Sequence, residues 1–195
     1  MPDYEKLRKN LEAEGFSVSF FPTAAAASDY LDAALDGRTI GIGGSMTIRE
    51  MGLADRLALH NQVIWHWADG VLQDAATTQV YLSSLNGVAE TGELINIDGT
   101  GNRVASGLFG HQKVYFIVGR NKIAPDYDAA LWRARNIASP KNAQRLHKNT
   151  PCAVKGDKCY DCKSPERICS ALVVYWQKPT SMDFEVVLID EDLGY

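Results

Sequence analysis

The chain has 195 residues, of which 46% are hydrophobic and 23% charged, and this composition is typical of one globular domain with its own core. The net charge is −4 and no block of basic residues is present, which argues against a nucleic-acid partner. No stretch approaches the roughly 18 apolar residues of a membrane span, and the first residues lack the apolar segment of a secretion signal. We therefore expect a cytoplasmic protein without a membrane partner.

Four segments carry apolar residues at the spacing of a helix. They are residues 3–14, 24–35, 45–59 and 126–138. Thr23 is placed to cap the second helix, and Ser45 or Thr47 to cap the third. Pro125 stands at the entrance of the fourth helix, and Pro140 is expected beyond its end, because proline interrupts a helix interior.

Apolar runs of strand length lie between these helices and after them. They are residues 16–21, 38–43, 62–67, 79–85, 94–97, 113–119, 169–177 and 184–195. The sequence Asp98-Gly99-Thr100-Gly101 is a turn signature, after which we expect the chain to return as the second arm of a hairpin.

The alternation of strands and helices predicts an α/β fold, with a single domain over residues 1–195. We expect a three-layer, Rossmann-like architecture, in which a largely parallel sheet carries helices on both faces. Because the close of the chain is richer in strands, a small antiparallel portion is expected there.

A glycine-rich stretch, "TIGIGGSMTIREMGL" (39–53), lies where a strand leads into a helix. Backbone N–H groups at Gly43 and Gly44, with the hydroxyls of Ser45 and Thr47, can bind an anion. Met46 excludes the dinucleotide fingerprint, and no Gly-Lys-Ser/Thr follows for a nucleotide-binding P-loop. The alternative interpretation is a helix cap with a tight turn.

Polar residues are crowded in the segment from 86 to 104. Glu90 follows a strand, where a carboxylate can act as a general base or nucleophile. Four further residues are candidates for binding a ligand: Asn96, Asp98, Asn102 and Arg103. For Asp98 and Asn102 the alternative is a structural role in the turn, because both residue types favour turn geometry.

Basic residues follow the strongest predicted strand, in "VGRNKIAPD" (118–126). Arg120 or Lys122 at this strand end can meet a phosphate or a carboxylate. The alternative interpretation is a solvated basic turn.

The cysteines are confined to one loop, residues 150–170, with the spacing C-x6-C-x2-C-x6-C. They are Cys152, Cys159, Cys162 and Cys169. With no histidine inside the loop, a site here is all-thiolate and suits zinc or an iron–sulfur cluster. Free thiols and disulfides are the alternatives.

Four segments together resemble the LUD family, named for lactate utilisation. They are "GIGGSMTIREMGL", "ETGELINIDGTGNRVA", "VGRNKIAPDYDAALWRARNIASPKNAQRL" and "VVLIDEDLGY". The cysteine loop, "TPC…KC…DCKSPERIC", is similar to that of short family members. The resemblance implies a fold like those of ribose-phosphate isomerase and acyl-CoA transferases. It matches Glu90 to the transferases' glutamate, the glycine-rich stretch to their anion loop, and Lys122 to a lysine frequent in the family.

The resemblance also implies a function, because the family is linked to oxidation of L-lactate to pyruvate beside iron–sulfur subunits. This chain lacks a ferredoxin-type cysteine run and any flavin or dinucleotide motif. Our first hypothesis is therefore a subunit or accessory protein of lactate utilisation that binds a small anionic metabolite and a metal or cluster. The alternatives are a stand-alone transferase or isomerase for an acyl-CoA or sugar phosphate, with Glu90 as nucleophile or base, and a structural or regulatory module.

Overall fold

Helices and strands alternate along the computed structural model, which describes residues 1–68 and 70–195. The strands are β1 (Ser17–Phe21), β2 (Thr39–Ile42), β3 (Gln62–Trp65), β4 (Val80–Ser83), β5 (Gly87–Ala89), β6 (Leu94–Asp98), β7 (Lys113–Gly119), β8 (Ile123–Ala124), β9 (Ala171–Tyr175) and β10 (Asp183–Ile189). The helices are α1 (Tyr4–Ala13), α2 (Ala24–Ala34), α3 (Met46–Glu50), α4 (Leu53–Leu57), α5 (Leu72–Ala75), α6 (Asn102–Ser106), α7 (Tyr127–Arg133), α8 (Ser139–Arg145) and α9 (Pro151–Lys155).

The central sheet has six parallel strands in the order β1-β10-β7-β4-β2-β3. Its middle strands are apolar on both faces, as expected for a parallel sheet that is covered on each side. In β7, Tyr115 and Ile117 join the core on one face, whereas Val114, Phe116 and Val118 join the core on the other.

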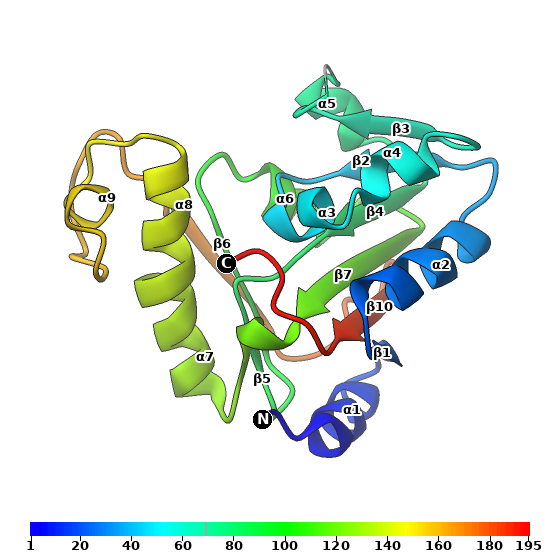
Figure 1. Ribbon diagram of the computed structural model, residues 1–195, viewed down its shortest axis with the longest axis horizontal. Helices are drawn as coiled ribbons and strands as arrows, with labels where there is room; N and C mark the ends of the chain where they lie inside the picture. Colours follow the sequence, from blue (N-terminus) through cyan, green and yellow to red (C-terminus); the bar gives the residue numbers. More distant parts are fainter. Residues whose placement is uncertain (69) are drawn as a thin grey trace.

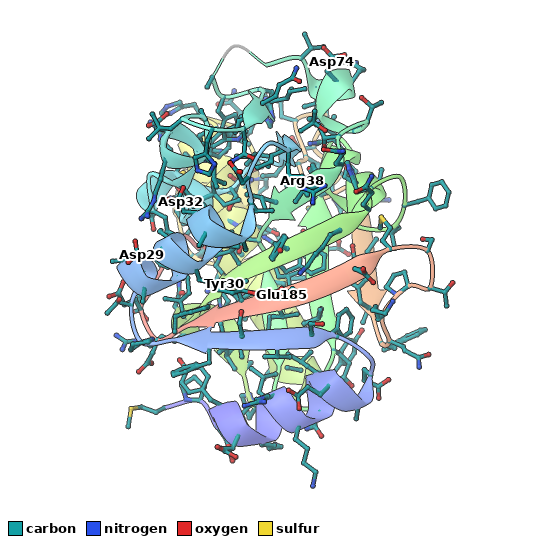
Figure 2. The ribbon with its side chains drawn as sticks, turned by 90° about the vertical axis from the view of Figure 1, so that its right-hand side faces the viewer. Asp29, Tyr30, Asp32, Arg38, Asp74 and Glu185 are labelled. Carbon is teal, nitrogen blue, oxygen red and sulfur yellow. The ribbon has the colours of Figure 1, made fainter. Side chains whose placement is uncertain are left out.

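Helices α2, α3 and α4 cover the first face of this sheet. Figure 2 shows Tyr30 of α2 beside Glu185 of β10, and the Tyr30 hydroxyl donates a hydrogen bond of 2.7 Å to the Glu185 carboxylate. That buried carboxylate also accepts a hydrogen bond of 2.7 Å from Lys113 Nζ. The pair of bonds satisfies a charge that would otherwise be costly to bury.

The second face is covered by α1 together with a smaller sheet, in the order β8-β5-β6-β9. Strand β6 is antiparallel to β5 and β9, and β8 is parallel to β5. Helix α7 packs on the outer side of this sheet, so the small sheet lies between α7 and the central sheet (Figure 1). A Cβ at Gly87 would lie 2.5 Å from the carbonyl oxygen of Ala130, so only glycine permits this packing distance.

The predicted fold class is confirmed: the chain is an α/β protein with a parallel six-stranded sheet, flanking helices and a smaller mixed sheet. The antiparallel portion includes β9 as expected, but β10 lies inside the parallel sheet. Among the described residues, no helix has both the length and the apolar character required to cross a membrane.

Several boundaries differ from the prediction for local reasons. The third helix is divided into α3 and α4 at Gly52, whose φ of 60° interrupts the helix. The predicted hairpin return after Asp98 is wrong, because residues 102–106 form the short helix α6.

The predicted helix end before Pro140 is also wrong. Residues 134–138 form a π-helical turn, and α8 continues from it through Pro140. Ser139 Oγ donates a hydrogen bond of 2.9 Å to the carbonyl oxygen of Ala134 inside this turn. The irregular turn accommodates the proline, whose missing N–H would break a regular helix.

Candidate functional site

A cleft of about 400 Å³ lies at the carboxyl ends of the central strands. Gly44 follows β2, Trp67 follows β3 and Asn86 follows β4, and all three line the cleft. Its other walls are residues 97–103, helix α8 with the residues after it, and residues 165–168 of the cysteine loop. Open α/β sheets bind their ligands at this edge.

Cationic side chains outnumber carboxylates in the cleft wall. The cations are Arg103, Arg145, Lys148 and Arg167, and the carboxylates are Asp98 and Glu166. Asp98 accepts hydrogen bonds of 2.8 Å from the backbone N–H groups of Gly99 and Arg103, and Glu166 accepts bonds of 3.1 and 3.0 Å from Asn149. Arg103 and Arg167 also have carboxylate partners, Asp98 at 3.9 Å and Asp161 at 3.3 Å. Arg145 and Lys148 have no ion pair within the described residues, so the wall keeps a positive charge that favours an anion.

Arg145 is held in place over the aromatic wall of the cleft. Its guanidinium carbon lies 4.7 Å from the ring centroid of Trp67. Its Nε and Nη2 donate hydrogen bonds of 3.1 and 2.9 Å to Asn142 Oδ1. Partial burial lowers the pKa of Arg145, but an arginine stays charged at neutral pH. The planar guanidinium is therefore oriented before an anion arrives.

A narrow hollow of about 40 Å³ adjoins the cleft and contains Lys122. The hollow and the cleft share Gly44, Trp67, Asn86, Arg103 and Asn142. Only 4% of Lys122 is exposed. Its Nζ donates hydrogen bonds of 2.8 Å to Thr47 Oγ1 and 2.9 Å to Ser84 Oγ. Both acceptors are neutral hydroxyls.

The electrostatics around Lys122 oppose its positive charge. Burial lowers the pKa of Lys122 to about 7, and repulsion from Arg133 and Arg103 acts in the same direction. Glu50 offsets the repulsion only in part. An amine that is partly neutral at physiological pH and lies beside a cleft is a functional candidate.

Arg133 is a second buried cation behind the hollow. It donates hydrogen bonds to three backbone carbonyl oxygens: Asn121 at 2.6 Å, Asn86 at 2.7 Å and Tyr195 at 3.3 Å. Burial lowers the pKa of Arg133 to about 10. The side chain thus ties α7 to the loops that follow β4, β7 and β10, which fixes the floor of the site.

The glycine-rich stretch caps a helix, as one of the two interpretations of the sequence expected, and it also lies at the wall of the hollow. Ser45 Oγ accepts a hydrogen bond of 3.3 Å from the N–H of Ile48, so Ser45 caps α3. A Cβ at Gly43 would lie 2.6 Å from Tyr81 Oη, and one at Gly44 would lie 3.1 Å from the Trp67 ring. A side chain at Gly43 would displace Tyr81, and one at Gly44 would press on the Trp67 ring. Gly44 and Ser45 also line the hollow.

Glu90 lines neither the cleft nor the hollow. Its Oε1 accepts a hydrogen bond of 2.9 Å from the backbone N–H of Asp3, and its Oε2 lies 3.4 Å from Lys6 Nζ. The carbonyl oxygen of Glu90 accepts a further bond of 2.7 Å from Asn10. These contacts attach α1 to the end of β5, so the structure does not bring Glu90 together with Lys122 or the glycine-rich stretch.

Of the four remaining predicted ligand residues, three line the cleft and one does not. Asn102 and Arg103 line the cleft. Asp98 also lines it, but its carboxylate is used to cap the turn before α6. Asn96 is fully buried in β6 and does not line the cleft, and its amide has no hydrogen-bond partner in the described part of the chain.

The four cysteines are separate free thiols. Cys159 Sγ lies 3.8 Å from Arg135 Nη2, Cys169 Sγ lies 3.2 Å from Arg167 Nε, and Cys152 Sγ lies 3.3 Å from Thr150 Oγ1. Within residues 1–68 and 70–195, no group of three or more His, Cys, Asp or Glu side chains is placed to hold a metal ion. As placed, the thiols do not fit zinc or an iron–sulfur cluster.

Sequence reasoning missed most of the outer wall of the cleft. The missed residues are His66, Trp67, Asn142, Arg145, Lys148 and Arg167. Trp67 at the end of a strand was an available signal. For Asn142 and Arg145 the sequence offered no such signal, because the predicted helix ended at Pro140.

Comparison with known proteins identifies the family of the chain. The model of the LUD domain matches residues 4–189. The chain belongs to the LUD domain family. A crystal structure of a DUF162 family protein from Deinococcus radiodurans is similar to this LUD protein, with a TM-score of 0.56 and 12% sequence identity over 95% of this chain and 94% of that one. At this identity the likeness supports the fold alone. No curated protein sequence matches the chain.

Proposed function

We propose that this LUD protein acts in L-lactate utilisation as a subunit or accessory protein that binds a small anionic metabolite. The observation that carries the proposal is the cleft, where four cations meet two carboxylates that are already hydrogen-bonded. Arginine side chains oriented in advance favour a carboxylate or a phosphate. The family's link to lactate makes a carboxylate the first candidate.

Oxidation of lactate releases two electrons, so an accessory role requires redox partners. We propose iron–sulfur subunits as those partners, on the basis of the family link. The thiols of this chain do not fit a cluster as they are placed, and we assign no step to a metal here. The alternative of a stand-alone transferase with Glu90 as nucleophile loses its basis, since Glu90 binds α1 outside the cleft.

Thermal unfolding with a panel of ligands tests the binding role. The panel contains L-lactate, pyruvate, inorganic phosphate, coenzyme A and the uncharged amide of lactate. At ten times its Kd, a specific ligand stabilises the folded chain by about 1.4 kcal/mol, which raises Tm by roughly 3–6 °C for a chain of this size. We expect this shift with at least one anion and none with lactamide.

Two variants locate the binding. In Arg145→Gln the ligand-induced shift should fall by more than half, because the oriented guanidinium is removed. Arg8→Gln is the control: Arg8 is an exposed arginine on α1, and its only ion pair in the described residues is with Glu12. A shift with lactamide as large as that with the anions, or no shift with any anion, would reject the proposed function.

A further inference from the structure

The hydrogen bonds of Lys122 match a neutral amine. An ammonium group has three N–H donors, whereas a neutral amine has two and a free electron pair. Nζ donates to two acceptors, the hydroxyls of Thr47 and Ser84. It has no ion pair in the part of the chain that the structure describes. Two hydroxyl acceptors are enough for both N–H groups of a neutral amine, whose electron pair would then be free to react.

The charged groups around Lys122 support the same protonation state. Arg133 and Arg103 are cations that repel an ammonium at this position, and burial removes its hydration. The acidic group on this side is Glu50, and its Oε2 already accepts a hydrogen bond of 2.6 Å from the N–H of Gly194. A buried lysine of this kind is suited to nucleophilic attack on a carbonyl carbon.

The hollow around Lys122 shares five wall residues with the cationic cleft. Arg103 lines both spaces, so an anionic group bound by Arg103 lies next to the hollow that contains Nζ. A ligand that reaches both must be small, must carry an anionic group, and must present an electrophilic carbon beside that group. Small carbonyl compounds with a carboxylate or a phosphate meet these conditions.

We propose that Lys122 forms an imine with a small carbonyl compound that carries a carboxylate or a phosphate. This inference rests on the proposed function and adds a covalent step to it. The amine nitrogen attacks the carbonyl carbon, a C–N bond forms, and the carbonyl electron pair moves to the oxygen, which takes up a proton. The carbinolamine then loses that oxygen as water, leaving the imine. The reaction is reversible, and no oxidant or reductant takes part.

The hydroxyls that hold the amine also serve the proton transfers. Thr47 Oγ1 and Ser84 Oγ lie 3.4 Å apart and both contact Nζ. A hydroxyl both accepts and donates a proton, so this pair can take the proton released from nitrogen and return one to the departing oxygen.

Trapping with cyanoborohydride tests the imine, because reduction converts it to a stable amine on the modified lysine. The full chain is incubated at pH 7.5 with pyruvate, with dihydroxyacetone phosphate, or with acetone as the uncharged carbonyl. Peptide mass spectrometry then maps the adduct. We expect a single adduct on Lys122, at least tenfold above acetone, with the carboxylate or the phosphate compound. The compound that reacts identifies the anionic group.

Two lysine variants, together with the position of the adduct in the peptide map, show whether Lys122 is the residue that reacts. Lys122→Met should lose the adduct, and Lys141→Met, at an exposed lysine on α8 outside the cleft, should keep it. Should Lys122→Met fail to fold, the peptide map of the wild-type chain still decides the question. Adducts confined to exposed lysines, or no adduct with either anionic carbonyl compound, would overturn the proposal.

The trapping experiment and the thermal-shift experiment can fail independently of each other. L-lactate has no carbonyl group that forms an imine, so its thermal shift reports anion binding alone. A shift with lactate but no adduct with the carbonyl compounds removes the imine and leaves the binding role. An adduct on Lys122 without any anion-induced shift supports the imine and removes the binding role.

Discussion

Replacing Lys122 with methionine changes how the stability of the chain depends on pH. The unfolded chain keeps the lysine proton up to the usual pKa of 10.5, whereas the folded chain releases it at about 7. Between these values the unfolded state binds more protons, so the free energy of unfolding of the wild-type chain rises with pH. Methionine has nearly the same length and no proton to lose, so this contribution disappears in the variant.

The magnitude follows from the two pKa values. Their separation corresponds to about 5 kcal/mol, by which the protonated lysine lowers the free energy of unfolding of the wild-type chain below pH 7. Between pH 7 and pH 10 the wild-type chain regains about 3 to 4 kcal/mol of this. The variant loses two hydrogen bonds to Thr47 and Ser84, which costs roughly 1–3 kcal/mol at every pH. Relative to wild type, Lys122→Met should therefore be least destabilised, or even stabilised, at pH 7 and most destabilised at pH 10.

Urea denaturation followed by circular dichroism at pH 7, 8, 9 and 10, under reducing conditions, measures the effect. Tyrosines, cysteines and the other lysines titrate in both chains and cancel in the difference between them. The control Lys141→Met should follow wild type within about 0.5 kcal/mol at each pH, as exposed substitutions do. A difference between wild type and Lys122→Met that stays constant within that margin would show that Lys122 is not buried as described.

Three further measurements test other parts of the structure. Ser45→Ala should lower the free energy of unfolding by about 1 kcal/mol in urea, because the cap of α3 is lost. Gly87→Ala should lower it by roughly 1–3 kcal/mol, because the new methyl group meets the backbone of α7. Contact with Asp32 raises the pKa of His60, so protonation of His60 stabilises the fold at low pH and the effect is lost as pH rises. Wild type should thus lose slightly more Tm between pH 6 and pH 8 than His60→Gln, as followed by calorimetry.

Local signals in the sequence were sufficient for much of the fold. The buried parallel strand β7 is a continuous apolar run, and strands of this kind are recognisable without knowledge of their neighbours. Helix caps are also local: Thr23 Oγ1 accepts a hydrogen bond from Ala26, three residues further on. These features depend on residues close together in the chain, so a single sequence contains them.

The candidate site depended on long-range contacts that no local pattern contains. Glu90 and Lys122 each follow a strand, but the sequence does not indicate that Glu90 follows a strand of the smaller sheet and meets α1. Lys122 is buried because residues 193–195 return over it, where Thr47 donates a hydrogen bond to the carbonyl oxygen of Leu193. The sequence alone does not distinguish an exposed basic turn from a buried amine, because the distinction depends on those long-range contacts.

The π-helical turn between α7 and α8 determines which residues of α8 face the cleft. Figure 1 shows these helices as one continuous rod. In a regular helix of 3.6 residues per turn, the face that Ala130 presents to the small sheet would continue through Ile137 and Lys141. The wider turn shifts that face by one residue, so Ala138 and Asn142 line the cleft instead and Lys141 is exposed. A relative with a regular helix here would place its cleft residues one position earlier in the sequence than this chain does.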